Sequence, residues 1–204
     1  MNIKNLVIAV IILAAVWFIY DKMTTPDIKN LDNAGRAIVA FGNSLTYGAG
    51  APRGEDYPAK LAKKTGHPVI NLGVSGDRST DGLVRINSVF QHNPYMVLIE
   101  FGGNDYMKKT PFDQTAAAVE QMINLVQAHG AIAVVVDTGG PFMGEYTKTY
   151  KKMAGEKGAV FVPAILDGII TDTRLKSDPI HPNAAGYTIV ADRVYNAIEK
   201  YLKY

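Results

Sequence analysis

The chain has 204 residues, 48% of them hydrophobic, and a formal net charge of +2. This length suits one domain with a sizeable core plus a short appendage, and the near balance of charges argues against nucleic acid as a partner. The sequence contains no cysteine, which excludes disulfides, thiolate-bound metals and a thiol nucleophile.

The N-terminal residues differ in kind from the rest of the chain. An unbroken apolar run, residues 6–20, follows Lys4 and ends in aromatic residues that include Trp17 and Tyr20. The run has the length of a signal-peptide core, lacks a small-residue cleavage site, and ends in residues typical of a membrane interface. We therefore expect a signal anchor over residues 1–23, which would hold an exported domain at the inner membrane, in the periplasm or outside the cell. A cleaved signal peptide is the alternative.

Beyond the anchor, a polar segment precedes an alternation of strands and helices. Residues 24–35 are predicted to be a linker and residues 36–204 the folded domain. Short apolar runs predict strands at residues 37–41, 69–72, 95–101, 131–136 and 159–162. Helical spacing predicts helices at residues 57–64, 81–90, 115–129, 146–157 and 183–202. The alternation predicts an α/β fold, a three-layer αβα sandwich around a parallel sheet of about five strands.

Ligands of such sheets bind beyond the carboxyl ends of the strands. The unusual loops of this chain all fall at that edge, at residues 43–44, 73–80, 102–105, 138–144 and 178–181. We expect them to converge on a single site.

Three residues in these loops have the chemistry of an acyl-transfer site. Ser44 follows a buried strand, so a strand-to-helix turn would expose its hydroxyl, and His181 lies three residues after Asp178 in a loop stiffened by prolines. Asp178 would orient the imidazole, which would deprotonate Ser44 for attack. Taken alone, Ser44 and His181 could each be an ordinary helix cap.

Four sequence blocks support the catalytic interpretation together. They are residues 42–46, 71–77, 102–105 and 178–183. In this order they resemble the SGNH (GDSL-like) hydrolase family, most closely its branch of multifunctional bacterial esterases, thioesterases and lysophospholipases. The resemblance runs from about Arg36 to the C-terminus and implies the flavodoxin-like SGNH hydrolase fold. It also implies a nucleophile at Ser44 and an oxyanion hole made by the backbone N–H groups of Ser44 and Gly76 and the side chain of Asn104.

The resemblance implies ester hydrolysis, with an ester-bearing small molecule, a lipid or a glycan as substrate. No metal or other cofactor is needed by this mechanism. Tyr47, Tyr106, Phe142 and Met143 lie in rim loops and are expected to line an acyl pocket. The alternatives are an O-acetyl esterase of an envelope polysaccharide, a non-catalytic SGNH-like binding domain, and a flavodoxin-like nucleotide binder, although no phosphate-binding loop is present.

One residue departs from the family pattern. The first block of the family has aspartate before the serine, and this chain has Asn43. Asparagine caps a helix about as well as aspartate but lacks its charge near the imidazolium that forms during the reaction. We therefore expect the native chain to be active, but less active than an Asn43→Asp variant.

Overall fold

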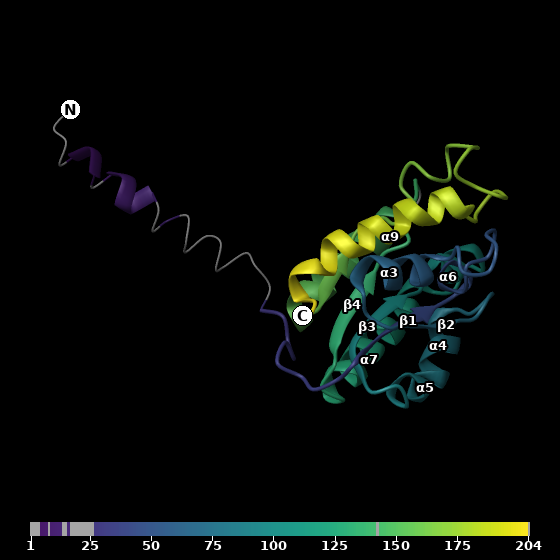
Figure 1. Cartoon of the computed structure of the whole chain (residues 1–204), viewed down its shortest axis with the longest axis horizontal. Helices are drawn as coiled ribbons and strands as arrows, with labels where there is room; N and C mark the ends of the chain where they lie inside the picture. Colours follow the sequence, from purple (N-terminus) through teal and green to yellow (C-terminus); the bar gives the residue numbers. More distant parts are fainter. Residues whose placement is uncertain (1–4, 8, 14–15, 17–26, 142, 204) are drawn as a thin grey trace.

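The computed structural model describes residues 5–7, 9–13, 16, 27–141 and 143–203 (Figure 1). Its centre is a sheet of five parallel strands in the order β2-β1-β3-β4-β5. The strands are β1 (Ala37–Gly42), β2 (Val69–Gly73), β3 (Pro94–Glu100), β4 (Ile132–Val136) and β5 (Val160–Val162). From β1 the chain adds β2 on one side and then crosses to add β3 on the other. The carboxyl ends of β1 and β3 therefore flank the point at which a sheet of this topology binds its ligand.

Helices cover both faces of the sheet, as the alternation predicted. In Figure 1, α3 (Tyr57–Thr65) and α9 (Ala184–Ile198) lie on one side, and α4 (Ser79–Arg85), α5 (Asn87–Phe90) and α7 (Phe112–Ala128) lie on the other, where α8 (Gly144–Lys157) also packs. Successive strand residues point to opposite faces. Ile38 and Ala40 of β1 thus join the core under α3 and α9, whereas Val39 and Phe41 join the core under α4, α5, α7 and α8.

The helices differ from the prediction mainly at their ends. The predicted helix over residues 81–90 is divided into α4 and α5 at Ile86, where the hydroxyl of Ser88 donates to the Arg85 carbonyl at 2.9 Å. The strand-to-helix turn predicted at Ser44 forms the short helix α2 (Ser44–Tyr47). A further short helix, α6 (Gly103–Met107), occupies a loop for which no helix was predicted. Both lie at the carboxyl edge of the sheet. A 3₁₀ turn, η1 (Glu199–Tyr201), ends the last helix.

The predicted linker packs against the domain in its described part, residues 27–35. The Asn30 side chain donates to the Ala131 carbonyl at 2.9 Å, and the Asn33 side chain donates to the Tyr95 carbonyl at 3.1 Å. These carbonyls lie at the amino ends of β4 and β3. The polar side chains that indicated a linker therefore satisfy backbone groups at the amino ends of these strands.

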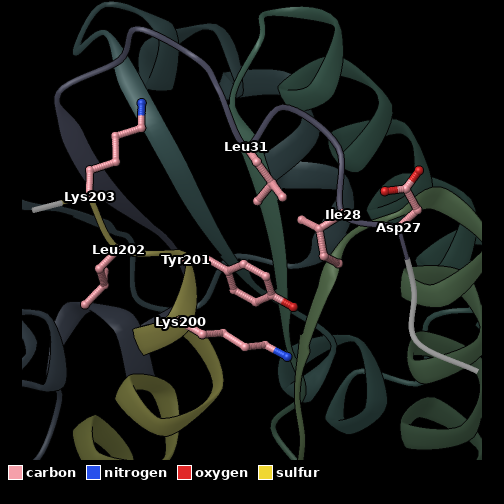
Figure 2. A pocket seen from close by; sticks show the side chains of 7 residues that line it. All are labelled: Asp27, Ile28, Leu31, Lys200, Tyr201, Leu202 and Lys203. Atoms are coloured by element: carbon pink, nitrogen blue, oxygen red, sulfur yellow. The ribbon is translucent and has the colours of Figure 1, made fainter. Parts of the chain in front are cut away.

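A cavity of about 440 Å³ separates this segment from the C-terminal turn. Figure 2 shows its walls, formed by Asp27, Ile28, Leu31, Lys200, Tyr201, Leu202 and Lys203. These residues include no serine or histidine, so the nucleophilic chemistry predicted from the sequence does not reside at this end of the sheet.

The predicted signal anchor, residues 1–23, lies largely outside the described residues. Within the described ranges, no helix combines the length and the hydropathy that a membrane span requires.

Candidate active site

Ser44 begins α2 directly after β1. Asn43 precedes it as the cap of this short helix, and the Asn43 side-chain oxygen accepts from the backbone N–H of Leu45 at 3.0 Å. Asn43 and Leu45 are buried, whereas Ser44 retains partial exposure at the edge of the sheet. The turn thus fixes the backbone on both sides of a serine whose hydroxyl reaches the surface, as the sequence predicted.

The structure brings Ser44, His181 and Asp178 together. The Nε2 atom of His181 lies 3.0 Å from Ser44 Oγ, and its Nδ1 atom lies 2.7 Å from Asp178 Oδ2. A carboxylate can only accept, so the proton of the neutral ring belongs on Nδ1, and Nε2 is left as the acceptor for the Ser44 hydroxyl. This is the arrangement that a serine nucleophile and its general base require.

Asp178 is held by bonds within its own loop. Its Oδ1 atom accepts from the backbone N–H groups of Ile180 and His181, both at 2.9 Å. The hydrogen bond from the His181 ring, assisted by these N–H groups, lowers the pKa of Asp178 to about 2. The carboxylate therefore stays ionised beside the imidazole at neutral pH, although its side chain is 44% exposed.

The two other predicted oxyanion-hole residues lie on neighbouring segments. Asn104 is buried in α6 and donates from Nδ2 to the Asp77 carbonyl at 2.8 Å, which leaves one hydrogen of the amide for a ligand. Gly76 lies one residue before Asp77, and its carbonyl accepts from Lys108 Nζ at 2.7 Å. The loop carrying Gly76 is thus tied to α6 and its C-terminal cap residue, Lys108, by these two bonds.

The glycine at position 76 is explained by its backbone conformation. An ideal Cβ at this position would meet no protein atom within 4 Å, so crowding by the fold is not the reason. The φ angle of Gly76 is +89°, a left-handed conformation that other residues rarely adopt. Glycine is required by the backbone angle of this loop.

Two side chains hold this loop against the sheet. Arg85 donates to Asp77 Oδ2 at 2.6 Å and to the carbonyls of Leu72 and Gly42, both at 2.9 Å. It therefore joins the ends of β1 and β2 to the loop of Gly76. Asp105 is buried and accepts from the N–H and hydroxyl of Ser79 at 2.9 and 2.7 Å, which fixes the start of α4 beside α6.

A cavity of about 560 Å³ opens beside Ser44, Asn104 and His181. Of the residues expected to line an acyl pocket, Tyr106 and Met143 do so, whereas Tyr47 does not and is 61% exposed. Phe142 lies outside the described residues. Most of the remaining wall is apolar, and its side chains were not among those predicted to line the pocket. It includes Leu45, Pro141, Ala164, Leu166, Ile170 and Ile180.

Sequence reasoning also missed Glu100, the last residue of β3. Its side chain is fully buried, and four donors surround the carboxylate. They are Asn43 N at 3.4 Å, Asn43 Nδ2 at 3.2 Å, and the hydroxyls of Thr46 and Thr138, each at 3.1 Å. Burial raises the pKa of Glu100 to about 7 against the opposing effect of these donors. A charged residue inside the otherwise apolar run of β3 was the available signal.

This contact overturns the expectation about Asn43. We expected an aspartate at this position to improve the site, but the Asn43 amide donates to Glu100. A carboxylate in its place would face a second buried carboxylate at close range, and the two could share the space only by retaining a proton. One buried carboxylate, that of Glu100, therefore already lies beside position 43.

The fold and the arrangement of Ser44, His181 and Asp178 define a hydrolase of the serine-nucleophile class on an α/β sheet. Residues 40–189 match the model of the GDSL-like lipase/acylhydrolase family, and the chain belongs to that family. It is a carboxylic ester hydrolase with a Ser-His-Asp triad.

Relatives and solved structures agree with this assignment. The thioesterase 1/protease 1/lysophospholipase L1 of Escherichia coli (strain K12) is 28% identical over 169 residues, 78% of this chain and 81% of that protein. The arylesterase of Vibrio mimicus is 28% identical over 182 residues, 83% of this chain and 91% of that protein. The crystal structure of TesA shares the fold, with a TM-score of 0.76 and 24% identity over 82% of this chain and all of that one.

Proposed function

We propose that this chain hydrolyses carboxylic esters and acyl thioesters through an acyl-enzyme on Ser44. The observation that carries the proposal is the continuous line of hydrogen bonds from Asp178 through His181 to the Ser44 hydroxyl. His181 would take the hydroxyl proton as Ser44 Oγ forms a bond to the carbonyl carbon. The same proton would then pass to the leaving alcohol or thiol, and His181 would activate the water that releases the acid.

The negative charge formed on the carbonyl oxygen needs donors at that position. We assign this role to the backbone N–H groups of Ser44 and Gly76 and to the second amide hydrogen of Asn104. Such donors are held in position before the reaction begins, and each lowers the activation free energy by about 3–4 kcal/mol. The hydrogen bond from Asn104 to the Asp77 carbonyl fixes the direction in which its amide donates.

The cavity beside Ser44 favours acyl groups larger than acetyl. Its volume of about 560 Å³ and its apolar wall suit a hydrocarbon chain. We propose aryl esters, lysophospholipids and acyl thioesters as the substrate class, in line with the names of the relatives. A deacetylase of an envelope polysaccharide would have no use for most of this wall, and the intact line from Asp178 to Ser44 argues against a non-catalytic binding domain.

Hydrolysis of p-nitrophenyl esters from acetate to palmitate by the full chain tests both parts of this proposal. We expect activity on chains longer than acetate, lost by about 10⁴-fold or more in Ser44→Ala. Ser88→Ala, in α5 and outside the cavity, is the matched control and should behave as the native chain does. Near-native turnover in Ser44→Ala would exclude the serine mechanism. A preference for acetate alone would favour the deacetylase.

We propose further that residues 1–23 export the domain and anchor it to the inner membrane. The apolar run over residues 6–20 supports this proposal. Asp27, where the described domain begins, lies beside the C-terminal turn, at the end of the sheet opposite Ser44. An anchor there would leave the active site pointing away from the attachment. Membrane fractionation of cells expressing the full chain, compared with a chain starting at Asp27, tests the proposal, and recovery of both as soluble proteins would contradict it.

A further inference from the structure

The carboxylate of Glu100 has no part in the mechanism described above, yet it lies directly under the turn that carries the nucleophile. Oε1 accepts from Asn43 Nδ2 and from Thr138, and Oε2 accepts from Asn43 N and from Thr46. Asn43 precedes Ser44, and Thr138 begins the loop that continues along the cavity. The buried side chain of Glu100 therefore connects the nucleophile turn to one wall of the acyl pocket.

The direction of these hydrogen bonds requires an acceptor at position 100. Thr46 has a single hydroxyl proton, which it donates to Glu100, so the contact with Tyr57 at 3.0 Å must be donated by the Tyr57 hydroxyl. The Asn43 amide is oriented in the same way. Its oxygen caps Leu45, so its NH₂ group must face Glu100. A protonated Glu100 would bring a hydroxyl donor among groups that are themselves donors. At least one of these hydrogen bonds would then have to change direction.

We propose that Glu100 is the positioning residue of the nucleophile turn, and that this turn works with a single buried negative charge, which Glu100 supplies. The Asn43–Glu100 pair carries one charge and needs no shared proton. An aspartate at position 43 beside Glu100 would give a pair with the same charge only while a proton stayed between the two carboxylates. The proposal rests on the ester hydrolysis proposed above.

The phenols around Glu100 stay neutral over the pH range of an assay. They are Tyr57 on α3, Tyr150 on α8 and Tyr187 on α9, and burial raises the pKa of all three phenols above the ordinary value. Asp137 and Asp105 on the adjoining segments have partners of their own in Thr147 and Ser79. A pH effect that follows residues 43 and 100 is therefore attributable to that pair.

Exchanging the charge between the two positions tests the proposal in the full chain. Three variants are compared with the native chain: Glu100→Gln, Asn43→Asp, and the double variant with both changes. The readouts are kcat/KM for p-nitrophenyl butyrate from pH 5 to 9 and the rate at which a p-nitrophenyl phosphonate labels Ser44. Glu120→Gln on α7 and Asn87→Asp at the exposed start of α5 are the matched controls.

Glu100→Gln removes the charge and should lower both rates about tenfold, the equivalent of one pKa unit of lost interaction. Adding Asn43→Asp should restore them to within about threefold of the native values, because the double variant again has one carboxylate and one amide. Asn43→Asp alone should match the native chain near pH 6 and fall behind as the pH rises and the shared proton is lost. The acid limb of the profile should involve one ionisation fewer in Glu100→Gln than in the native chain, because the carboxylate at position 100 is gone.

A purely structural role would lower the rates equally at every pH and would show no rescue. Rates in Glu100→Gln equal to the native ones, or a folded double variant no better than Glu100→Gln, would overturn the proposal. Thermal unfolding is measured for each variant. The single variant Glu100→Gln could fail to fold. In that case a double variant that folds and is active supports the exchange of charge, and a double variant that does not fold contradicts it. A native chain whose activity survives Ser44→Ala would instead refute the proposed function.

Discussion

Two carboxylates lie near Ser44, one bonded to the turn that carries it and one bonded to His181, and they differ in burial and in hydrogen-bond partners. Glu100 is fully buried at the end of β3, where burial raises its pKa to about 7. Asp178 is 44% exposed in a loop, where the hydrogen bond from His181 lowers its pKa to about 2. The same functional group is thus made hard to ionise in one place and easy to ionise in the other.

The two regions are also held differently. The partners of Glu100 come from the turn after β1, from α2 and from the loop after β4, which are distant in sequence and joined by the sheet. Asp178 bonds only to Ile180 and His181 of its own loop among the described residues. Changes around Glu100 should therefore affect stability and activity together, whereas changes in the Asp178 loop should affect activity with little effect on stability.

The largest expected effect is in the exposed loop. Asp178→Asn should lower kcat by about 10³–10⁴-fold, because an amide donor opposite Nδ1 favours the wrong tautomer of His181. The melting temperature should stay within about 2 °C of the native value, since no buried bond is lost. Ester hydrolysis and thermal unfolding measure the two effects, with Asp172→Asn in the neighbouring loop as a control that retains native activity. A large fall in melting temperature with activity retained would reverse the assignment of roles.

The exposed half of the site was predictable from sequence because its chemistry is local. Asp178 and His181 are three residues apart and interact directly, so their spacing carried the information. Glu100 was missed because its role depends on which strands are neighbours. It is paired in register with Gly42 of β1, 58 residues earlier in the chain, and only the order β2-β1-β3 places it beneath Ser44. Sequence alone predicted the strands, but it did not establish their order.

The other differences between the predicted and the observed structure concern where single side chains point. Tyr47 follows the nucleophile closely in sequence, yet the single turn of α2 directs it to solvent. Asn30 and Asn33 looked like linker residues because their hydrogen-bond acceptors belong to remote strands. The contacts of Asn30 and Asn33 are long-range, whereas the direction of Tyr47 is set by the local turn of α2.

A smaller effect is expected in the buried region from Thr46→Val. The substitution keeps the shape of the side chain but removes the hydroxyl that links Tyr57 to Glu100. Leaving two buried polar groups with fewer partners should cost about 1–3 kcal/mol of unfolding free energy, and kcat/KM should fall by less than about tenfold. Chemical denaturation and ester hydrolysis measure the pair of effects. Thr188→Val, at an exposed position of α9, should change neither. Full stability in Thr46→Val would show that Glu100 does not depend on this bond.

The sharpest test of the comparison is in the pH dependence of stability. The pKa of Glu100 is raised on folding from 4.5 to about 7, so its contribution is fully present below pH 4.5 and is lost as the pH rises through about 7. The pKa of Asp178 is lowered from 3.8 to about 2, so its contribution is present above pH 3.8 and is lost as the pH falls through about 2. The two carboxylates therefore act on stability in opposite directions and in separate pH windows.

Unfolding free energies measured by denaturant from pH 2 to 8 resolve the two windows. Between pH 4.5 and 7 the native chain should lose stability relative to Glu100→Gln with a slope of at most about 1.4 kcal/mol per pH unit, the limit for one proton. Asp178→Asn should run parallel to the native chain there and depart from it only below about pH 4, by a small amount because solvent screens an exposed pair. Equal slopes for Glu100→Gln and the native chain across the upper window would mean that Glu100 ionises at its ordinary pKa. The contrast between the buried and the exposed carboxylate would then rest on geometry alone.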